Sequence, residues 1–478
     1  MSEPPGPLVG MAGDHPRQPP VARRRRTIAA VVGGAAVIVL VVVIVAVLTG
    51  GSSPVVSTTT DTPAPPAPNP AAMPAAGTEL WNTDTGPLAR LSGEAVLPPT
   101  GWVVSLAGGT AVMAPGIGYW DSDEGNAADT VLGVNARTGA VRWRWQRNGW
   151  RLEAIAASAA NGVAATLWIT NPATLGNSYA LTVLDLRTGR LDWMRSVVGS
   201  GASSGQVVIV GPEVVALADD AASAFAASGG RPLWRHAAPA GCDWGVDSVG
   251  AASSEITLGD AAVFPYGCGG ADSGLGGIAR LAPATGATIW QRRLPSAPQA
   301  LAQAAGSVAV IRSTGLSDDA VAQVFDVATG RTRFSTTMFA TQEYTGMLAV
   351  DRAGNVYVLA AGPADSEMLV CVDGADSRVL WSVPLGQEYL ALSVGVVGGQ
   401  VVVGGLDTSL PQGTPELRLF SAATGTQLAQ HSTPQFTYGV MSGWDSAFAL
   451  EPGLVVVGDS TNQEVRGAVS LPQLTGTS

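Results

Sequence analysis

Short apolar segments bounded by Gly, Asn or Asp follow one another along the chain from about residue 78 onward. The region 346–384 shows the order within one unit: MLAV, VYVLAA, MLVCVDG and RVLWSV are apolar segments, and DRAGN separates the first two. Apolar runs of this length are typical of strands, and short polar spacers are typical of hairpins. The pattern therefore predicts units of four antiparallel strands.

A turn motif repeats at the start of the last strand of each unit. The copies are ARTGAVRW (136–143), LRTGRLDW (186–193), ASGGRPLW (227–234), PATGATIW (283–290), VATGRTRF (327–334), GADSRVLW (374–381) and AATGTQLA (422–429). Glycine suits such turns because it adopts positive φ without strain. Six of the seven copies place an aromatic residue four positions after the turn, and the copies lie about 48 residues apart on average. This period, built from strands, predicts a β-propeller.

The two ends of the repeat region indicate how the ring closes. Seven turn motifs predict seven outer strands, whereas residues 447–472 hold three strands without a Thr-Gly-Trp ending. Residues 77–86 contain an otherwise unassigned Trp81. If this segment supplies the fourth strand of the last unit, no long sheet edge is left exposed. The sequence therefore predicts an all-β, eight-bladed propeller, with seven blades as the alternative.

The repeat resembles the pyrroloquinoline-quinone-type propeller repeat, whose pattern is an apolar strand, Ala or Asp, Thr-Gly and then Trp. The resemblance covers about residues 78–472. It implies that the repeated aromatic residues dock between neighbouring blades, namely Trp143, Trp193, Trp234, Trp290 and Trp381, with Phe334 as a weaker substitute and Trp81 at the closing segment. Because a single blade cannot bury both faces of its sheet, these side chains supply the apolar contact between blades.

The chain looks most like the non-enzymatic, membrane-anchored bacterial branch of the quinoprotein alcohol dehydrogenase-like superfamily. That branch includes the accessory propeller of the outer-membrane β-barrel assembly machinery. The quinone-dependent dehydrogenases of the superfamily carry two adjacent cysteines, a Ca²⁺ site and a catalytic aspartate. Here Cys242, Cys268 and Cys371 are not adjacent, and the other ligands cannot be matched. We therefore expect no catalytic residue, no metal and no cofactor.

A membrane anchor is predicted before the propeller. The 22 residues Thr27–Leu48 contain no charged side chain, and at a rise of about 1.5 Å per residue they span a hydrocarbon core of about 30 Å. An uncleaved helix is favoured over a cleaved signal peptide, because the run is too long and leads into Gly50–Pro54 with no lipobox cysteine. Arg23–Arg26 place the tail 1–26 in the cytoplasm and the rest of the chain outside.

Two further segments flank the propeller. Residues 49–77 form a linker rich in Pro, Ala and Thr, and residues 473–478 form a short C-terminal tail. The exterior part beyond Leu48 has 21 arginines against 35 Asp and Glu residues. Such an acidic part argues against nucleic acid as a partner.

The cysteines point to a disulfide. Cys242 and Cys268 lie 26 residues apart within one predicted blade, and both have glycines beside them in loop-like sequence. Outside the membrane such a pair can form a stable disulfide, so we expect these two to be joined. Cys371, within MLVCVDG, is expected to be a buried free thiol on a strand.

Other stretches that suggest chemistry are better explained by turns or packing. GASSG (201–205) and GDS (458–460) resemble hydrolase motifs, but neither has the required strand-to-helix context. The acidic stretch 121–129 lacks the spacing of a calcium-binding loop and is interpreted as a solvated loop. One cluster stays open between an exposed aromatic-basic patch and outer-strand packing, with packing favoured: Arg144, Trp145, Arg147, Trp150 and Arg151.

These observations predict a single-pass membrane protein with a cytoplasmic N-terminus and an extracytoplasmic propeller. We expect it to act as a non-catalytic scaffold or binding module in the bacterial cell envelope, with envelope proteins as partners. The alternative is a small-ligand receptor or an enzyme that uses the central channel of the propeller.

Overall fold

The computed structural model divides the chain into two units, Met1–Pro68 and Asn69–Ser478. It describes residues 79–82, 102–115, 130–147, 150–170, 178–199, 205–218, 220–245, 262–269, 275–304, 306–313, 319–339, 348–361, 367–376, 378–409, 414–432, 448–451, 453–459 and 464–470. All of these belong to the second unit, and none of them forms a helix capable of crossing a membrane. The predicted tail 1–26, transmembrane helix 27–48, linker 49–77 and tail 473–478 lie outside the described residues.

The described strands form eight antiparallel sheets of four strands each. Seven sheets consist of consecutive strands. The first four are β2 (Trp102–Ala107), β3 (Thr110–Pro115), β4 (Thr130–Asn135) and β5 (Val141–Gln146); β6 (Trp150–Ser158), β7 (Val163–Thr170), β8 (Tyr179–Asp185) and β9 (Leu191–Val197); β10 (Gln206–Val210), β11 (Glu213–Ala218), β12 (Ala221–Ala226) and β13 (Pro232–Ala237); and β14 (Cys242–Trp244), β15 (Ala262–Cys268), β16 (Leu275–Leu281) and β17 (Thr288–Leu294).

The next three sheets repeat this order. They are β18 (Pro298–Ala304), β19 (Ser307–Ser313), β20 (Asp319–Asp326) and β21 (Thr332–Phe339); β22 (Leu348–Val350), β23 (Val356–Ala361), β24 (Glu367–Val372) and β25 (Val379–Gly386); and β26 (Tyr389–Val397), β27 (Gln400–Asp407), β28 (Thr414–Ser421) and β29 (Gln427–Ser432). The strands β22–β25 correspond to the four apolar segments identified in residues 346–384. The prediction of four-stranded units is confirmed.

The remaining sheet joins the two ends of the repeat region. Its strands β30 (Phe448–Glu451), β31 (Leu454–Asp459) and β32 (Glu464–Ser470) are followed by β1 (Glu79–Asn82), which pairs with β32. In this pairing Asn82 lies opposite Gly467. The N-terminal segment thus supplies the fourth strand of the last sheet.

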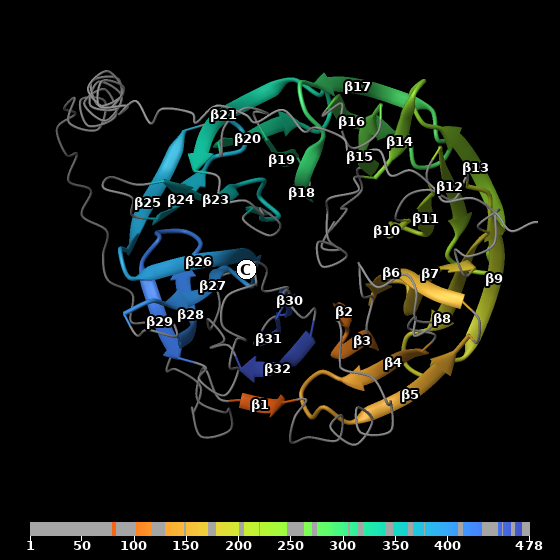
Figure 1. Ribbon diagram of the computed structural model, residues 1–478, viewed down its shortest axis with the longest axis horizontal. Coiled ribbons are helices and arrows are strands. Elements are labelled where there is room, and N and C mark those ends of the chain that lie inside the picture. The colour runs from red at the N-terminus through yellow and green to blue at the C-terminus, as the bar shows by residue number, and fades with distance from the viewer. Residues whose placement is uncertain are drawn as a thin grey trace, which may run out of the picture. The chain divides into compact units, whose positions relative to one another are not determined.

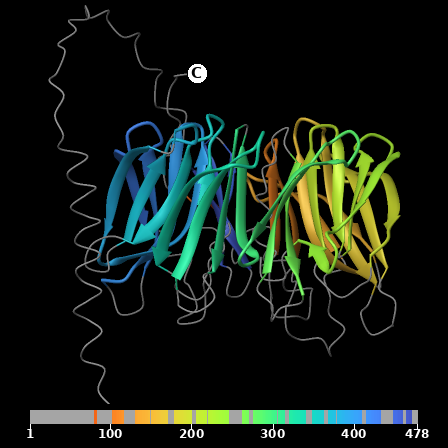
Figure 2. The same cartoon turned by 90° about the horizontal axis from the view of Figure 1, so that it is seen from above.

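The sheets follow one another around a ring (Figure 1). Each sheet contacts the next one in sequence, and β30 of the last sheet contacts β2 of the first. The fourth strand of each sheet lies on the circumference in Figure 1, and Figure 2 shows the strands running across the thickness of the ring. The fold of these residues is a β-propeller.

The burial pattern explains why the middle strands have no polar alternation. All six residues of β11, EVVALA, are buried, as are six of the seven residues of β8. Such strands have neighbouring sheets on both faces, so both sets of side chains leave water. The outer strand β5 differs, because Trp143 is its only buried residue. The core therefore lies between adjacent sheets, and single aromatic residues extend it to the outer strands.

Candidate interaction surface

Several of the turns that precede the outer strands are stabilised by their own side chains. In the copy at residues 185–190, the Asp185 carboxylate accepts hydrogen bonds from the Thr188 N–H at 2.8 Å and the Thr188 hydroxyl at 2.6 Å. These hydrogen bonds from Thr188 hold the pKa of Asp185 below its ordinary value. Gly189 follows with a φ of 66°, in the left-handed region. The sequence Asp-Leu-Arg-Thr-Gly thus builds a rigid turn at the edge of the ring.

Five tryptophans after these turns each connect their own sheet to the next one. Each indole N–H donates to the carbonyl oxygen of the first motif residue in the following sheet. The pairs are Trp143 to Leu186 at 2.9 Å, Trp193 to Ala227 at 2.7 Å, Trp234 to Pro283, Trp290 to Val327 at 2.7 Å and Trp381 to Ala422 at 3.0 Å. Because the same bond recurs around the ring, we call these contacts the tryptophan seams.

Each of these indole rings also lies against the glycine of the next turn. A Cβ atom added to that glycine would come within 2.4–2.7 Å of the ring, at Gly189, Gly230, Gly286, Gly330 and Gly425. A real Cβ atom does not approach a ring so closely, so the seam requires glycine. The Thr-Gly motif therefore has two roles, since the same glycine makes the turn and accommodates the tryptophan of the preceding sheet.

The seam after Phe334 is built differently. Phe334 packs against the core cluster of the next two sheets, but its ring has no N–H to donate. Instead the guanidinium of Arg333 donates to the Gly374 carbonyl, at the position that the indoles reach elsewhere, and it also contacts Asp326. The fourth motif residue of the next copy is Ser377 here, not glycine. Arg333 is a seam residue that the sequence analysis did not identify.

Two seam positions, Trp81 and Ala429, have no aromatic contact among the described residues. Trp81 lies in β1, where its backbone is paired with Ala468 of β32, but its side chain is outside the described residues. Ala429, the seventh copy, replaces the aromatic residue in β29.

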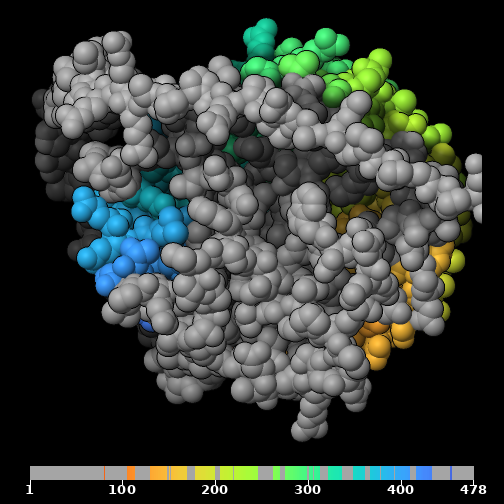
Figure 3. All heavy atoms as spheres, in the orientation of Figure 1, coloured from red at the N-terminus to blue at the C-terminus, as the bar shows by residue number. Residues whose placement is uncertain are grey.

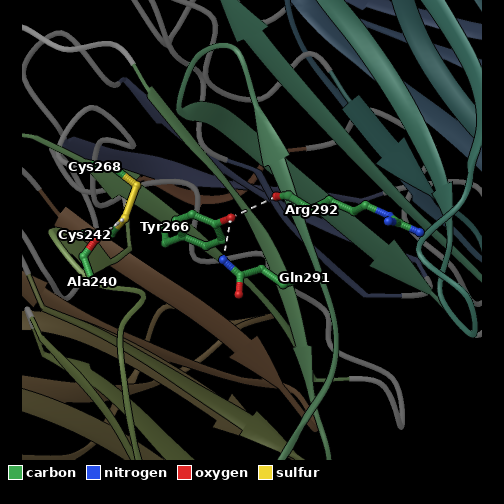
Figure 4. The surroundings of a disulfide bond; sticks show 6 residues. All are labelled: Ala240, Cys242, Tyr266, Cys268, Gln291 and Arg292. Carbon is green, nitrogen blue, oxygen red and sulfur yellow. Dashed lines mark hydrogen bonds between the residues drawn. A yellow bond between two sulfur atoms is a disulfide. The ribbon is translucent and has the colours of Figure 1, made fainter.

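Cys242 and Cys268 form a disulfide (Figure 4). They were expected in loops, but they lie opposite each other in the strands β14 and β15. The neighbouring glycines account for the difference, since Gly241 and Gly269 end the paired region with positive φ. The disulfide thus fastens the three-residue inner strand β14 to its sheet. In the same sheet the Tyr266 hydroxyl donates to the Arg292 carbonyl at 3.0 Å and accepts from Gln291 (Figure 4).

Cys371 is buried and free, as expected. Burial raises the pKa of its thiol to about 12, so the thiol is protonated and unreactive at neutral pH.

The aromatic-basic cluster joins the outer strand β5 of one sheet to the first strand β6 of the next. The Trp145 and Trp168 rings pack at a tilt of 54° with centroids 5.2 Å apart, and the Arg147 guanidinium lies 3.6 Å from the centroid of the Trp150 ring. Arg147 also contacts the Met194 sulfur at 2.6 Å, on the outer strand of the next sheet. Trp145 and Trp150 are half-buried, so they both pack and remain accessible. In Figure 3 the atoms of these two sheets, in orange and yellow, reach the surface at the rim.

The other candidate sites that the sequence suggested lie wholly or partly outside the described residues. Residues 121–129, residues 201–204 and Ser460 lie outside the described residues. Among the residues that the structure describes, no three His, Cys, Asp or Glu side chains are grouped so as to hold a metal ion.

Half-buried Glu367 is a polar group that the sequence analysis did not single out. Its carboxylate accepts a hydrogen bond from the Ala391 N–H of the next sheet at 2.5 Å. Removal from water raises the pKa of Glu367 to about 7, although this hydrogen bond opposes the shift. Because the contact joins segments 24 residues apart, no local motif reveals it.

Comparison with known proteins gives one family. The family described as outer membrane protein assembly factor BamB matches residues 127–315 and 317–471, which together make up more than half of the chain. No curated protein matches the chain.

Several solved structures are similar at low sequence identity. BamB from Moraxella catarrhalis has 14% identity and a TM-score of 0.46, covering 79% of this chain and 100% of that chain. Quinohemoprotein alcohol dehydrogenase from Comamonas testosteroni has 14% identity and a TM-score of 0.44, covering 79% and 77%. Sqt1 from Saccharomyces cerevisiae has 10% identity and a TM-score of 0.48, covering 78% and 97%.

Proposed function

Because the chain belongs to the family described as outer membrane protein assembly factor BamB, we propose that it is a non-catalytic scaffold in the bacterial cell envelope. Its ring of pyrroloquinoline-quinone-like repeats binds envelope proteins and holds them together. The family match over residues 127–315 and 317–471 is the observation that carries this proposal. The family's printed description concerns assembly, and a surface that brings proteins together suits that role.

The seams support a scaffold because they make the ring stiff. The aromatic residues Trp143, Trp193, Trp234, Trp290, Phe334 and Trp381 act as blade-docking residues, with Trp81 in the same role on β1. Five sheets are thereby fixed to the next one by an indole ring and its hydrogen bond. Preorganised surfaces bind partners at a lower entropic cost than flexible ones. The proposed ring has eight blades, which the eight described sheets support.

The proposed location is extracytoplasmic. Thr27–Leu48 crosses the membrane once, the tail 1–26 remains in the cytoplasm, and the linker 49–77 carries the ring outside. The apolar run and Arg23–Arg26 support this orientation. The Cys242–Cys268 disulfide supports it independently, because structural disulfides persist mainly outside the reducing cytoplasm.

Crosslinking in intact cells tests the proposal. An affinity-tagged full-length chain is crosslinked and purified, and the recovered proteins are identified by mass spectrometry. The control chain lacks residues 78–478 and keeps the tail, the apolar segment and the linker. The proposal predicts one or a few defined envelope proteins that the control does not recover. Recovery of the same background proteins from both chains contradicts it.

A further inference from the structure

Residues 130–199 carry a net positive charge, although the remainder of the ring is net acidic as a whole. Residues 130–199, which form β4–β9 and their connections, contain eight arginines and three acidic residues. The remainder of residues 49–478 has thirteen arginines against thirty-two acidic residues. We define the basic rim surface by six residues on β5, β6 and β9 and the connection between β5 and β6: Arg142, Arg144, Trp145, Arg147, Trp150 and Met194.

The acidic residues of this region do not neutralise the arginines of β5. Glu153 is buried, Asp185 is engaged by Thr188 within its own turn, and Asp192 pairs with Arg190 at 3.5 Å. Within the described part of the chain, no carboxylate forms an ion pair with Arg142, Arg144 or Arg147. Among the described residues of this part, a net positive charge therefore remains on a ring that is net acidic as a whole.

The surface also offers apolar contact. Met194 and Leu191 are each 43% exposed on β9, and Trp145 and Trp150 are half-buried. Stacking on Trp150 and contact with Met194 hold the Arg147 guanidinium in place. Arginine and tryptophan beside exposed apolar groups are the residue types that dominate binding energy at protein interfaces.

We propose that the basic rim surface docks an acidic segment of a partner protein, one that presents carboxylates together with an apolar side chain. The inference rests on the proposed function and names the chemistry of the partner. The fork of donors on arginine matches a carboxylate, and complementary charge steers such a segment to this sector of the ring. A long polyanion such as nucleic acid fits less well, because it would extend over the acidic remainder.

Site-specific photocrosslinking tests the surface directly. A photoreactive amino acid replaces Met194 in the full-length chain, and a matched chain carries it at Leu428, which is 40% exposed on β29. The proposal predicts protein adducts from position 194 and not from position 428. Mass spectrometry should place the adducts in a segment with an excess of Asp and Glu. Equal adducts at both positions, or an adducted segment without that excess, overturn the proposal.

Charge reversal separates docking from general charge effects. The variant Arg144→Glu with Arg147→Glu removes the local field, whereas Arg331→Glu with Arg378→Glu changes two exposed arginines elsewhere by the same charge. The probe is a fluorescein-labelled peptide of alternating Glu and Leu, whose anisotropy is measured with each purified full-length chain. The proposal predicts about tenfold weaker binding for the first variant only, and less binding at high salt. Equal binding by all chains overturns it.

The outcomes distinguish the two proposals. If tagged chains recover defined envelope proteins while position 194 gives no adduct, the scaffold proposal stands and the basic rim surface is not the docking site. If no partner is recovered at all and the peptide still binds, the surface binds acidic segments but the scaffold proposal fails. Binding to vesicles of phosphatidylglycerol without binding to the peptide overturns the assignment of a protein partner.

Discussion

Trp143 and Gly189 belong to neighbouring sheets, and a methyl group on Gly189 would come within 2.6 Å of the Trp143 indole ring. The indole N–H of Trp143 also donates a hydrogen bond to the Leu186 carbonyl oxygen, at 2.9 Å. One short turn thus determines both the geometry of its own sheet and the fit of the sheet before it. This dependence between copies explains why Thr-Gly and Trp recur together.

In the copy at residues 227–234, two adjacent glycines allow the cost of backbone strain and the cost of contact with the tryptophan to be measured separately. Gly229 and Gly230 both have positive φ, but a Cβ on Gly229 would meet nothing within 4 Å, whereas one on Gly230 would lie 2.4 Å from the Trp193 ring. We expect Gly229→Ala to cost about 1 kcal/mol from backbone strain alone. Gly230→Ala should cost a further 1–3 kcal/mol or so through overpacking. Urea unfolding of the two variants measures the difference, and equal costs would show that the seam tolerates a side chain.

Arg333 should be more important than its exposed neighbour Arg331. Arg333 donates to the Gly374 carbonyl and contacts Asp326, and its Nη1 also lies 3.1 Å from the Ser307 hydroxyl. Arg333→Met keeps the aliphatic length but leaves these groups without their donor, so we expect a loss of about 1–3 kcal/mol of unfolding free energy. Arg331→Met should change it by less than about 0.5 kcal/mol. Thermal unfolding of both variants provides the comparison, and similar midpoints would rule out a seam role for Arg333.

The thiol content of the protein follows from the disulfide. Under denaturing conditions without reductant we expect one titratable thiol per chain, that of Cys371, and three after reduction. Reduction, or replacement of Cys242 and Cys268 by Ala, should lower the unfolding free energy by about 3 kcal/mol, because it releases a loop of this length in the unfolded chain. Three thiols in protein purified from the envelope fraction without reductant would contradict the assignment.

Glu367 should make stability depend on pH. Its pKa is about 7 in the folded protein, above the ordinary value of 4.5, so the folded state binds the proton more tightly than the unfolded chain does. The resulting stabilisation is fully present below about pH 4.5 and is lost as the pH rises through 7. Relative to Glu367→Gln, the wild type should lose roughly 2 kcal/mol between pH 5 and pH 8. Chemical unfolding at both pH values tests this. Parallel pH profiles would show that the carboxyl is not perturbed.

The β1 strand should be needed for ring closure. Its pairing with β32 ties the N-terminal segment to the last sheet. A chain that lacks residues 1–86 leaves β32 as an open edge, and open edges promote association between molecules. We expect that chain to be less stable and to form aggregates on size-exclusion chromatography. A chain lacking only residues 1–68 is the control, and identical behaviour of the two would mean that β1 does not contribute.

The four-strand unit and the turn motif could be read from the sequence because their signals are local. Apolar runs, hairpin spacers and the Thr-Gly turn each lie within a few residues, and repetition makes every copy a test of the others. The position of Cys242 and Cys268 was less clear, since flanking glycines suggest loops although the residues face each other across two strands. Their pairing itself was predicted from their separation of 26 residues within one predicted blade and from the expected compartment.

Contacts between sheets could not be derived from local sequence. Arg333 reaches a carbonyl 41 residues away, and Arg147 reaches Met194 47 residues away. Such contacts depend on how one sheet is placed against the next, which the period alone does not determine. The requirement for glycine against each seam tryptophan is likewise a contact between sheets, so local sequence does not reveal it. A partial signal did exist, because the one copy with Phe334 is followed by the one copy with Ser377 in place of glycine.

We propose that the ring works on the outer side of the membrane, and thiol labelling in intact cells tests this location most directly. A single cysteine is introduced at Ser57 in the linker or at Ser2 in the N-terminal tail, and cells are treated with a membrane-impermeant maleimide before or after lysis. The account predicts labelling at position 57 in intact cells and labelling at position 2 only after lysis. Labelling at position 57 only after lysis would place the ring in the cytoplasm and contradict the account.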